Sequence, residues 1–212
     1  MPCKVIIGHG SALAAALEAW RASAPSLELR AVPIDAGADA AAVAAALDGP
    51  DGFKAGSVGD SVFVAVDAAF LNFHRLAAVE AARVLGLPMQ PLVCTGAIVS
   101  AGVVIGDNCL IGAGAIIGHG CRIGANAVIG AGAVLAAGVS IGESAWLDEG
   151  VVVGSGADIG AHTRLGLGVT VNHGVRIGAL AIVDKPGRVD ADVAARTYVL
   201  ATHATPLVIV GS

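Results

Sequence analysis

Charged and aromatic side chains are scarce in this sequence: Asp, Glu, Lys and Arg make up 14% of its 212 residues, and Phe, Trp and Tyr only 3%. With few aromatics, any core must be packed from small aliphatic side chains. The 12 basic residues are outnumbered by 17 acidic ones and form no basic stripe, which argues against a nucleic-acid partner. The length leaves room for two small folding units.

Long apolar runs, a signal peptide and paired cysteines are missing as well. Asp, Asn, Arg or Glu interrupts every apolar run well before the roughly 18 residues that a membrane-spanning helix needs. Met1 to Lys4 leads directly into a strand-like run, without the ordered parts of a signal peptide. The four cysteines have no CxxC spacing. We therefore expect a cytoplasmic protein with no membrane partner.

An aliphatic residue recurs every six positions, and this repeat dominates the sequence. The period matches neither a helix nor an alternating strand, and it is typical of a hexapeptide repeat. Glycine often follows the aliphatic, and a small residue often stands two positions before it. The repeated positions are Val93, Val99, Ile105, Ile111, Ile117, Ile123, Ile129, Leu135, Ile141, Leu147, Val153, Ile159, Leu165, Val171, Ile177 and Val183.

Such a repeat predicts a coil with three short strands per turn, in which one aliphatic per strand points to a narrow axis. Successive turns of parallel strands would stack about 4.8 Å apart, and the repeated segment is long enough for roughly five turns, whose ends need caps. Cys109 and Cys121 fall in the small-residue position, where we interpret them as buried fillers rather than reactive thiols.

The first ninety residues have a different pattern, in which strand-like and helix-like segments alternate. This indicates a small parallel α/β domain of the Rossmann-like type. We expect an α/β domain over 1–90, a left-handed parallel β-helix over 91–185, and a C-terminal tail or cap over 186–212. The expected strands are 4–7, 27–34, 61–66 and 89–93, and the expected helices are 12–22, capped by Ser11, 38–47 and 70–85.

A glycine turn after the first strand is a candidate anion site. The segment Gly8, His9, Gly10 joins a strand to a helix, and amides at a helix N-terminus bind phosphate groups. The third glycine of a dinucleotide motif is absent, and a tight turn needs glycine for structural reasons, so both interpretations stay open. Asp35, just past the second strand, could accept hydrogen bonds from a ribose or a base, or be a solvated turn carboxylate.

Histidines are the candidate catalytic residues of the repeat. His119 and His173 occupy the same repeat position fifty-four residues apart, so they should lie on one face of the coil, roughly 14 Å apart. His162 occupies a different position. His119 is the stronger candidate, because nearly four turns follow it and could form a groove, with the amide of Ala137 one turn beyond. A neutral imidazole of pKa about 6.5 can accept a proton from an amine or hydroxyl.

The segment from Ile117 to Gly124, with His119 and Cys121, resembles the catalytic segment of the sialic acid O-acetyltransferase-like family of left-handed β-helix sugar acetyltransferases. The resemblance extends to about Asp184. It implies a homotrimer with active sites between prisms, His119 as the general base and acetyl-coenzyme A (acetyl-CoA) as co-substrate. Implied substrate-binding residues for a nucleotide sugar are Gly8, Gly10, Ser11, Asp35 and Arg75, implied cofactor-binding residues are Ala137 and Ser155, and no metal ligands are implied.

The sequence departs from the family where an orienting acid is expected. Gly118 and Gly120 flank His119 where the family has acidic residues, Val128 replaces a second histidine, and Arg75 matches only across a short insertion. The orienting partner of His119 must then be another subunit or a water, or be missing.

Three functions compete on these observations. The first is acetylation of a nucleotide-linked sugar in surface-polysaccharide biosynthesis, which we favour. The second is a nucleotide-sugar-binding protein with impaired catalysis. The third is a zinc-dependent carbonic anhydrase of the same prism class, which needs three histidines around one metal and is disfavoured by the spacing of His119, His162 and His173. The acceptor sugar, the nucleotide and the choice between N- and O-acetylation stay open.

Overall fold

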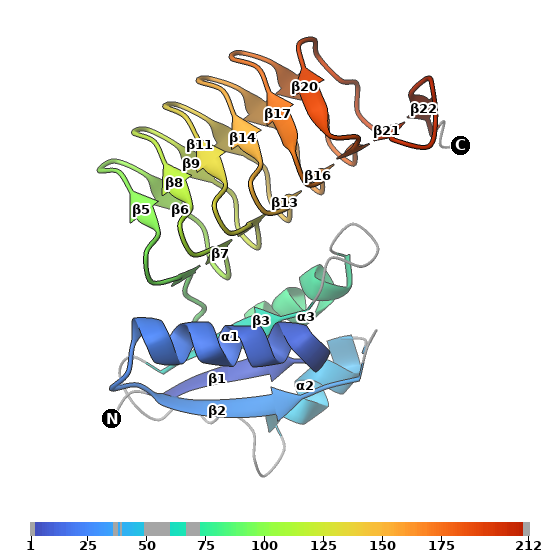
Figure 1. The fold of residues 1–212 in the computed structure, drawn as a ribbon. Coiled ribbons are helices and arrows are strands. Elements are labelled where there is room, and N and C mark those ends of the chain that lie inside the picture. Colours follow the sequence, from blue (N-terminus) through green and yellow to red (C-terminus); the bar gives the residue numbers. More distant parts are fainter. Residues whose placement is uncertain (1–2, 36–37, 39, 49–59, 67–72, 210–212) are drawn as a thin grey trace.

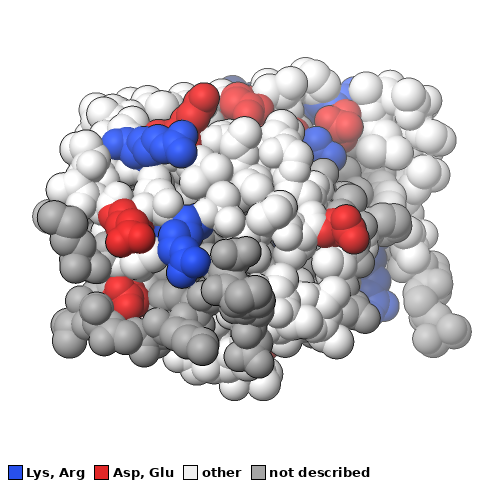
Figure 2. Space-filling view, turned by 90° about the horizontal axis from the view of Figure 1, so that it is seen from below, with Lys and Arg blue, Asp and Glu red and all other residues white. Residues whose placement is uncertain are grey.

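The computed structural model describes residues 3–35, 38, 40–48, 60–66 and 73–209, and it consists of an α/β domain beside a coil of short strands (Figure 1). This arrangement confirms the predicted fold class. No helix among these described ranges is long and apolar enough to span a membrane. On the face in Figure 2, acidic and basic side chains are scattered, without a large patch of one sign.

The α/β domain has the predicted alternation. Its elements are β1 (Cys3–Gly8), α1 (Gly10–Ser23), β2 (Glu28–Pro33), α2 (Ala40–Asp48), β3 (Ser61–Ala65) and α3 (Phe73–Val84). The strands form a parallel sheet of order β2-β1-β3. The predicted start of the third helix at residues 70–72 lies outside the described residues.

The first helix starts earlier than predicted. It begins at Gly10, its N-cap residue is His9, and the His9 side chain makes no capping hydrogen bond. Ser11 therefore lies within the first turn, and the prediction that it caps the helix is wrong. The cause is Gly10, whose φ of 52° lets the chain turn directly from β1 into the helix.

Alternating side chains of the buried strands pack on two sides of the sheet. Ile6 and Phe63 contact Ala16 and Trp20 of α1, whereas Val5 and the alternate residues of β3 pack with α2 and α3. Lys4 is buried on the α1 side, with Nζ 4.0 Å from the centre of a Trp20 ring and 3.0 Å from Oε1 of Gln90. Burial lowers the pKa of Lys4 to about 8.

The coil has three faces, each a sheet of parallel strands from successive turns. Face 1 contains β4 (Leu92–Val93), β7 (Leu110–Ile111), β10 (Val128–Ile129), β13 (Trp146–Leu147), β16 (Arg164–Leu165), β19 (Ile182–Asp184), β21 (Thr197–Leu200) and the antiparallel β22 (Leu207–Val208). Face 2 contains β5 (Ile98–Val99), β8 (Ile116–Ile117), β11 (Val134–Leu135), β14 (Val152–Val153), β17 (Val169–Val171) and β20 (Gly187–Val189). Face 3 contains β6 (Val104–Ile105), β9 (Arg122–Ile123), β12 (Ser140–Ile141), β15 (Asp158–Ile159) and β18 (Arg176–Ile177).

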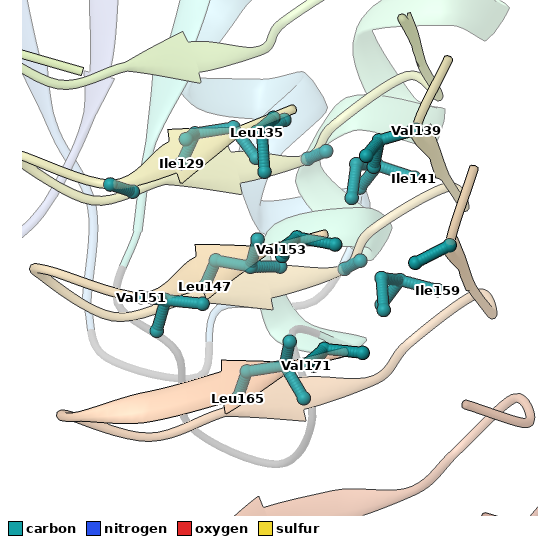
Figure 3. Packing of buried hydrophobic residues seen from close by; sticks show 14 of the residues in the cluster. Ile129, Leu135, Val139, Ile141, Leu147, Val151, Val153, Ile159, Leu165 and Val171 are labelled. Atoms are coloured by element: carbon teal, nitrogen blue, oxygen red, sulfur yellow. The ribbon is translucent and has the colours of Figure 1, made fainter. Parts of the chain in front are cut away.

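The predicted aliphatic positions form the axis of the coil. From Ile111 to Val183, each is at most 4% exposed, and Figure 3 shows those from Ile129 to Val171 stacked turn upon turn. The aliphatic residues of the first turn are more exposed, because no preceding turn of the coil covers them. Cys109 and Cys121 are fully buried, as expected for fillers, and their thiols also donate hydrogen bonds to the carbonyls of Gly124 and Ala136 in the next turn.

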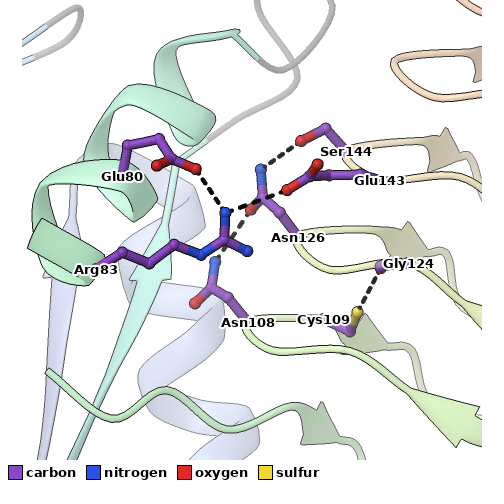
Figure 4. Close-up of polar contacts among 8 residues, drawn as sticks. All are labelled: Glu80, Arg83, Asn108, Cys109, Gly124, Asn126, Glu143 and Ser144. Carbon is purple, nitrogen blue, oxygen red and sulfur yellow. Dashed lines mark hydrogen bonds and ion pairs between the residues drawn. The ribbon is translucent and has the colours of Figure 1, made fainter. Parts of the chain in front are cut away.

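One edge of the coil differs from the other two and holds the α/β domain. The left-handed corner residues are glycines at the two edges that border face 2. Between faces 3 and 1 the corresponding residues are Asn108, Asn126, Ser144, His162, Leu180 and Arg196. Asn tolerates this conformation better than most residues, and here its side chain is used: Asn108 donates to Oδ1 of Asn126, and Asn126 to Oγ of Ser144 (Figure 4).

Buried polar contacts fix α3 and β3 to this edge. The Arg75 guanidinium donates to the carbonyls of Val64, Asn108 and Asn126 at 2.7–3.1 Å, and Oδ1 of Asn108 accepts from the Val64 amide at 2.7 Å. Arg83 adds a bridge to Glu143 at 3.2 Å (Figure 4). Because an unpaired buried donor is costly, these bonds specify one orientation of the two parts.

Candidate active site

The candidate catalytic residues lie on the edge between faces 2 and 3, which we call the histidine edge. Its successive corners carry His119, Ala137, Ser155 and His173, all exposed. The amides of Gly138, Gly156 and Gly174 donate to the carbonyls of His119, Ala137 and Ser155, respectively, at 2.9–3.0 Å. This ladder confirms that His119 and His173 share one edge, three turns apart.

The His119 ring is held by a contact that the sequence analysis missed. Its Nδ1 lies 2.7 Å from the carbonyl oxygen of Ala101, one turn earlier on the same edge. In the described part of the chain, Nε2 has no hydrogen-bond partner. The only sequence signal was the position of Ala101, eighteen residues before His119, which is one full turn.

Gly118 explains why the acid expected before His119 is absent. A Cβ there would lie 2.8–2.9 Å from backbone atoms of Leu135, Ala136 and Ala137, so the next turn leaves no room for a side chain. Gly120 has open space around it but a φ of 72°, which disfavours residues other than glycine.

Free backbone amides continue along the histidine edge beyond His119. Neither Ala137 nor Ser155 has a hydrogen-bond partner for its N–H among the described residues, and both residues are exposed. At the next corner the amide of His173 is occupied, because it donates to Oδ1 of Asn172 at 3.0 Å. The edge can therefore offer donors at two successive turns after His119.

Two of the predicted substrate-binding residues line one cavity. A cavity of about 400 Å³ lies between α1 and face 1, and Ser11 and Arg75 are in its wall. The rest of the wall is mostly apolar, with alanines of α1 on one side and Leu110, Val128 and Trp146 of face 1 on the other. Arg75 is 2% exposed, with its guanidinium already bonded to three carbonyls, so its evident role is to join the two parts of the chain.

The glycine turn and Asp35 lie at the carboxyl end of the small sheet. A Cβ on Gly8 would collide with the carbonyl of Ala65 in β3, so the packing of β1 against β3 already requires this glycine. Asp35 is exposed and lines a second hollow of about 430 Å³ with Pro33 and alanines of α2. The structure therefore places Ser11 and Asp35 in separate hollows.

The three histidines of the coil do not meet. His162 lies on the edge between faces 3 and 1, where its ring stacks on Phe73 with centroids 4.6 Å apart. His119 and His173 are on the histidine edge, three turns from each other. Within the described residues of one chain, no three His, Cys, Asp or Glu side chains are grouped to hold a metal ion, so this geometry gives the zinc hypothesis no support.

Known proteins share the hexapeptide repeat and the fold of this chain. Residues 93–137 match the bacterial transferase hexapeptide family model (six repeats). No curated protein sequence matches the chain. A histidine-to-alanine mutant of GDP-perosamine N-acetyltransferase from Caulobacter crescentus, solved with CoA and GDP-perosamine, is 25% identical, with a TM-score of 0.79 and coverage of 98% of this chain and 97% of that one.

Two further solved structures have the same arrangement. PerB from C. crescentus, also with CoA and GDP-perosamine, is 26% identical, with a TM-score of 0.77 and 93% of each chain covered. The acetyltransferase domain of PglB from Neisseria gonorrhoeae is 19% identical, with a TM-score of 0.63 and coverage of 98% and 100%, and it shows the fold alone. The repeats, the fold and these matches confirm the resemblance seen in the sequence: the chain has the bacterial transferase hexapeptide repeat over residues 93–137, and its whole structure is similar to that of left-handed β-helix sugar N-acetyltransferases.

Proposed function

We propose that this protein transfers an acetyl group from acetyl-CoA to the amino group of a nucleotide-linked sugar, with His119 as the general base. The main support is the environment of His119, which is exposed, with Nδ1 hydrogen-bonded to the carbonyl of Ala101 and Nε2 without a partner among the described residues. Two backbone amides without a hydrogen-bond partner in the described structure follow it on the same edge. The N-acetyltransferases of known structure named above, crystallised with CoA and GDP-perosamine, support this substrate class. We place this reaction in the cytoplasmic synthesis of surface polysaccharides.

In the proposed reaction, the acceptor nitrogen attacks the thioester carbonyl while Nε2 of His119 takes a proton from that nitrogen. The C–S bond then breaks, and the imidazolium returns the proton to the departing thiolate. The N–H of Ala137 stabilises the oxyanion, and the N–H of Ser155 binds the co-substrate farther along the edge. A ring already oriented through Nδ1 favours this function over a catalytically impaired binding protein.

We further propose that the protein is a homotrimer whose active sites lie between chains. In a three-sided prism, the histidine edge lies opposite face 1, and the cavity lined by Ser11 opens against face 1. The body of the prism thus separates the cavity of a chain from the His119 of the same chain. An acceptor bound in one chain would then react at the histidine edge of another.

Face 2 offers the surface for this assembly. Its outward-facing residues pair between neighbouring strands and form one apolar row of Ile98, Ile116, Val134 and Val152. Ile98, Ile116 and Val152 are 37–61% exposed. Face 1 is partly covered by the α/β domain, and face 3 carries mainly charged and polar residues outward. A contiguous exposed apolar patch is typical of an interface, and face 2 also borders His119.

Blocking the histidine edge tests the proposed co-substrate site. We expect Ala137→Glu to weaken CoA binding at least about tenfold, because a long acid would cover the amide and repel the phosphates. The matched control is Ala131→Glu, which changes another exposed alanine, at a corner between faces 1 and 2. Calorimetric titration with CoA measures both, and equal affinity of the two variants would contradict the assignment of this edge.

Placing a charge on face 2 tests the assembly. We expect Ile116→Asp to convert the trimer to monomers, since burying three unpaired carboxylates at the interface is costly. Val104→Asp is the control, because Val104 is 63% exposed in an equivalent outward position on face 3. Light scattering at micromolar concentration gives the mass. A monomeric wild type, or a trimeric Ile116→Asp variant, would refute this interface.

A further inference from the structure

The proposed function depends on the orientation of His119, and the structure supplies a partner for its ring that is not an acid. The carbonyl oxygen of Ala101 lies 2.7 Å from Nδ1. A carbonyl can only accept a hydrogen bond, so a bond at this distance requires the proton to be on Nδ1. The lone pair of the neutral ring is then on Nε2, the nitrogen that the described residues leave unpartnered.

Gly102 makes this contact possible. A Cβ on Gly102 would lie 3.1 Å from Cε1 of His119, closer than a side chain ordinarily approaches, and 3.5 Å from Nδ1, an ordinary contact distance. At the other glycines of the histidine edge, Gly120, Gly138, Gly156 and Gly174, an added Cβ would meet no atom within 4 Å. Gly102 is therefore the glycine of this edge at which an added side chain would displace the imidazole of His119.

We propose that Ala101 and Gly102 are the positioning residues of His119, and that they replace the orienting carboxylate through a main-chain carbonyl. The bond holds the ring as the Nδ1–H tautomer, and it persists when Nε2 gains a proton, because Nδ1 remains a donor in the imidazolium. This inference rests on the proposed function for its catalytic consequence, but the tautomer itself can be measured without any reaction.

Nitrogen NMR of histidine-labelled protein tests the tautomer directly. Above the pKa of the ring, we expect the wild type to show His119 with its proton on Nδ1, and assignment comes from the signal lost in His119→Gln. In Gly102→Ala the displaced ring should exchange between tautomers, with the proton mainly on Nε2 as in free histidine. A wild-type His119 protonated on Nε2 would overturn the proposal, whether or not the protein acetylates a sugar.

Kinetics test the consequence for catalysis. We expect Gly102→Ala to lower kcat by about 10- to 100-fold with little change in KM for either substrate, because a small displacement of a reacting group is enough for such a loss. Gly150→Ala is the matched control: its φ of 69° imposes similar backbone strain, but its Cβ would meet no atom within 4 Å and it lies off the histidine edge. Equal kcat values for the two variants, at similar melting temperatures, would contradict positioning by Gly102.

The two experiments separate this inference from the proposed function. Acetyl transfer by the wild type with an Nε2–H tautomer would refute the positioning device and leave the function intact. An Nδ1–H tautomer without acetyl transfer to any amino sugar would refute the function and leave the device intact.

Discussion

Replacing His119 with alanine is expected to lower kcat by about 10² to 10⁴, the usual contribution of a general base, while the affinity for CoA changes little. The ring has its Nδ1 bonded to Ala101 and its Nε2 unpartnered within the described residues, so its loss removes the proposed proton acceptor. The proposed contacts of CoA are the amides of Ala137 and Ser155, which the substitution leaves in place. Steady-state rates of thiol release and calorimetric titration with CoA measure the two quantities.

His173→Ala is the control for this variant. His173 occupies the same edge and is also exposed, but it lies three turns away, and its own amide donates to Oδ1 of Asn172. We expect its kcat to stay close to that of the wild type. Equal activity of wild type and His119→Ala would remove His119 as the base.

Replacing Ile129 with aspartate is expected to unfold or aggregate the protein. Ile129 has no exposed surface and lies on the axis of the coil, between Ile111 and Leu147 of the adjacent turns (Figure 3). An ion placed there has neither water nor a partner. The loss of more than about 4 kcal/mol from a substitution of this type is comparable to the whole stability of many domains.

A substitution of the same kind on the surface of the coil separates this effect from a general intolerance of acids. Val104→Asp puts an identical side chain at an exposed, outward position of β6. We expect its melting temperature to stay near that of the wild type. Thermal melts followed by circular dichroism compare the two, and a near-wild-type melt of Ile129→Asp would contradict the sixfold register.

The coil was predictable because its rule is local and repeated. One aliphatic at every sixth position sets which residues face the axis, and each from Ile111 onward is buried as expected. The start of α1 was harder to place, because Ser11 is a good capping residue by type. The left-handed conformation of Gly10 moves the cap to His9.

Contacts between distant segments could not be read from residue types alone. The resemblance implied Arg75 as a substrate-binding residue, whereas its bonds to the carbonyls of Asn108 and Asn126, 33 and 51 positions away, had no signal in the sequence. The orienting partner of His119 was expected to come from another subunit or a water, or to be missing. A main-chain carbonyl such as that of Ala101 carries no side-chain signature, so only the stacking of turns reveals it.

Thiol release from acetyl-CoA, measured with a panel of UDP-, GDP- and dTDP-linked 4-amino sugars, tests the proposed reaction most directly. We expect one member of the panel to give stoichiometric thiol, together with a sugar product heavier by one acetyl group on nitrogen. Clear binding of a nucleotide sugar and of CoA, with no thiol release and no acetylated product from any member, would contradict it.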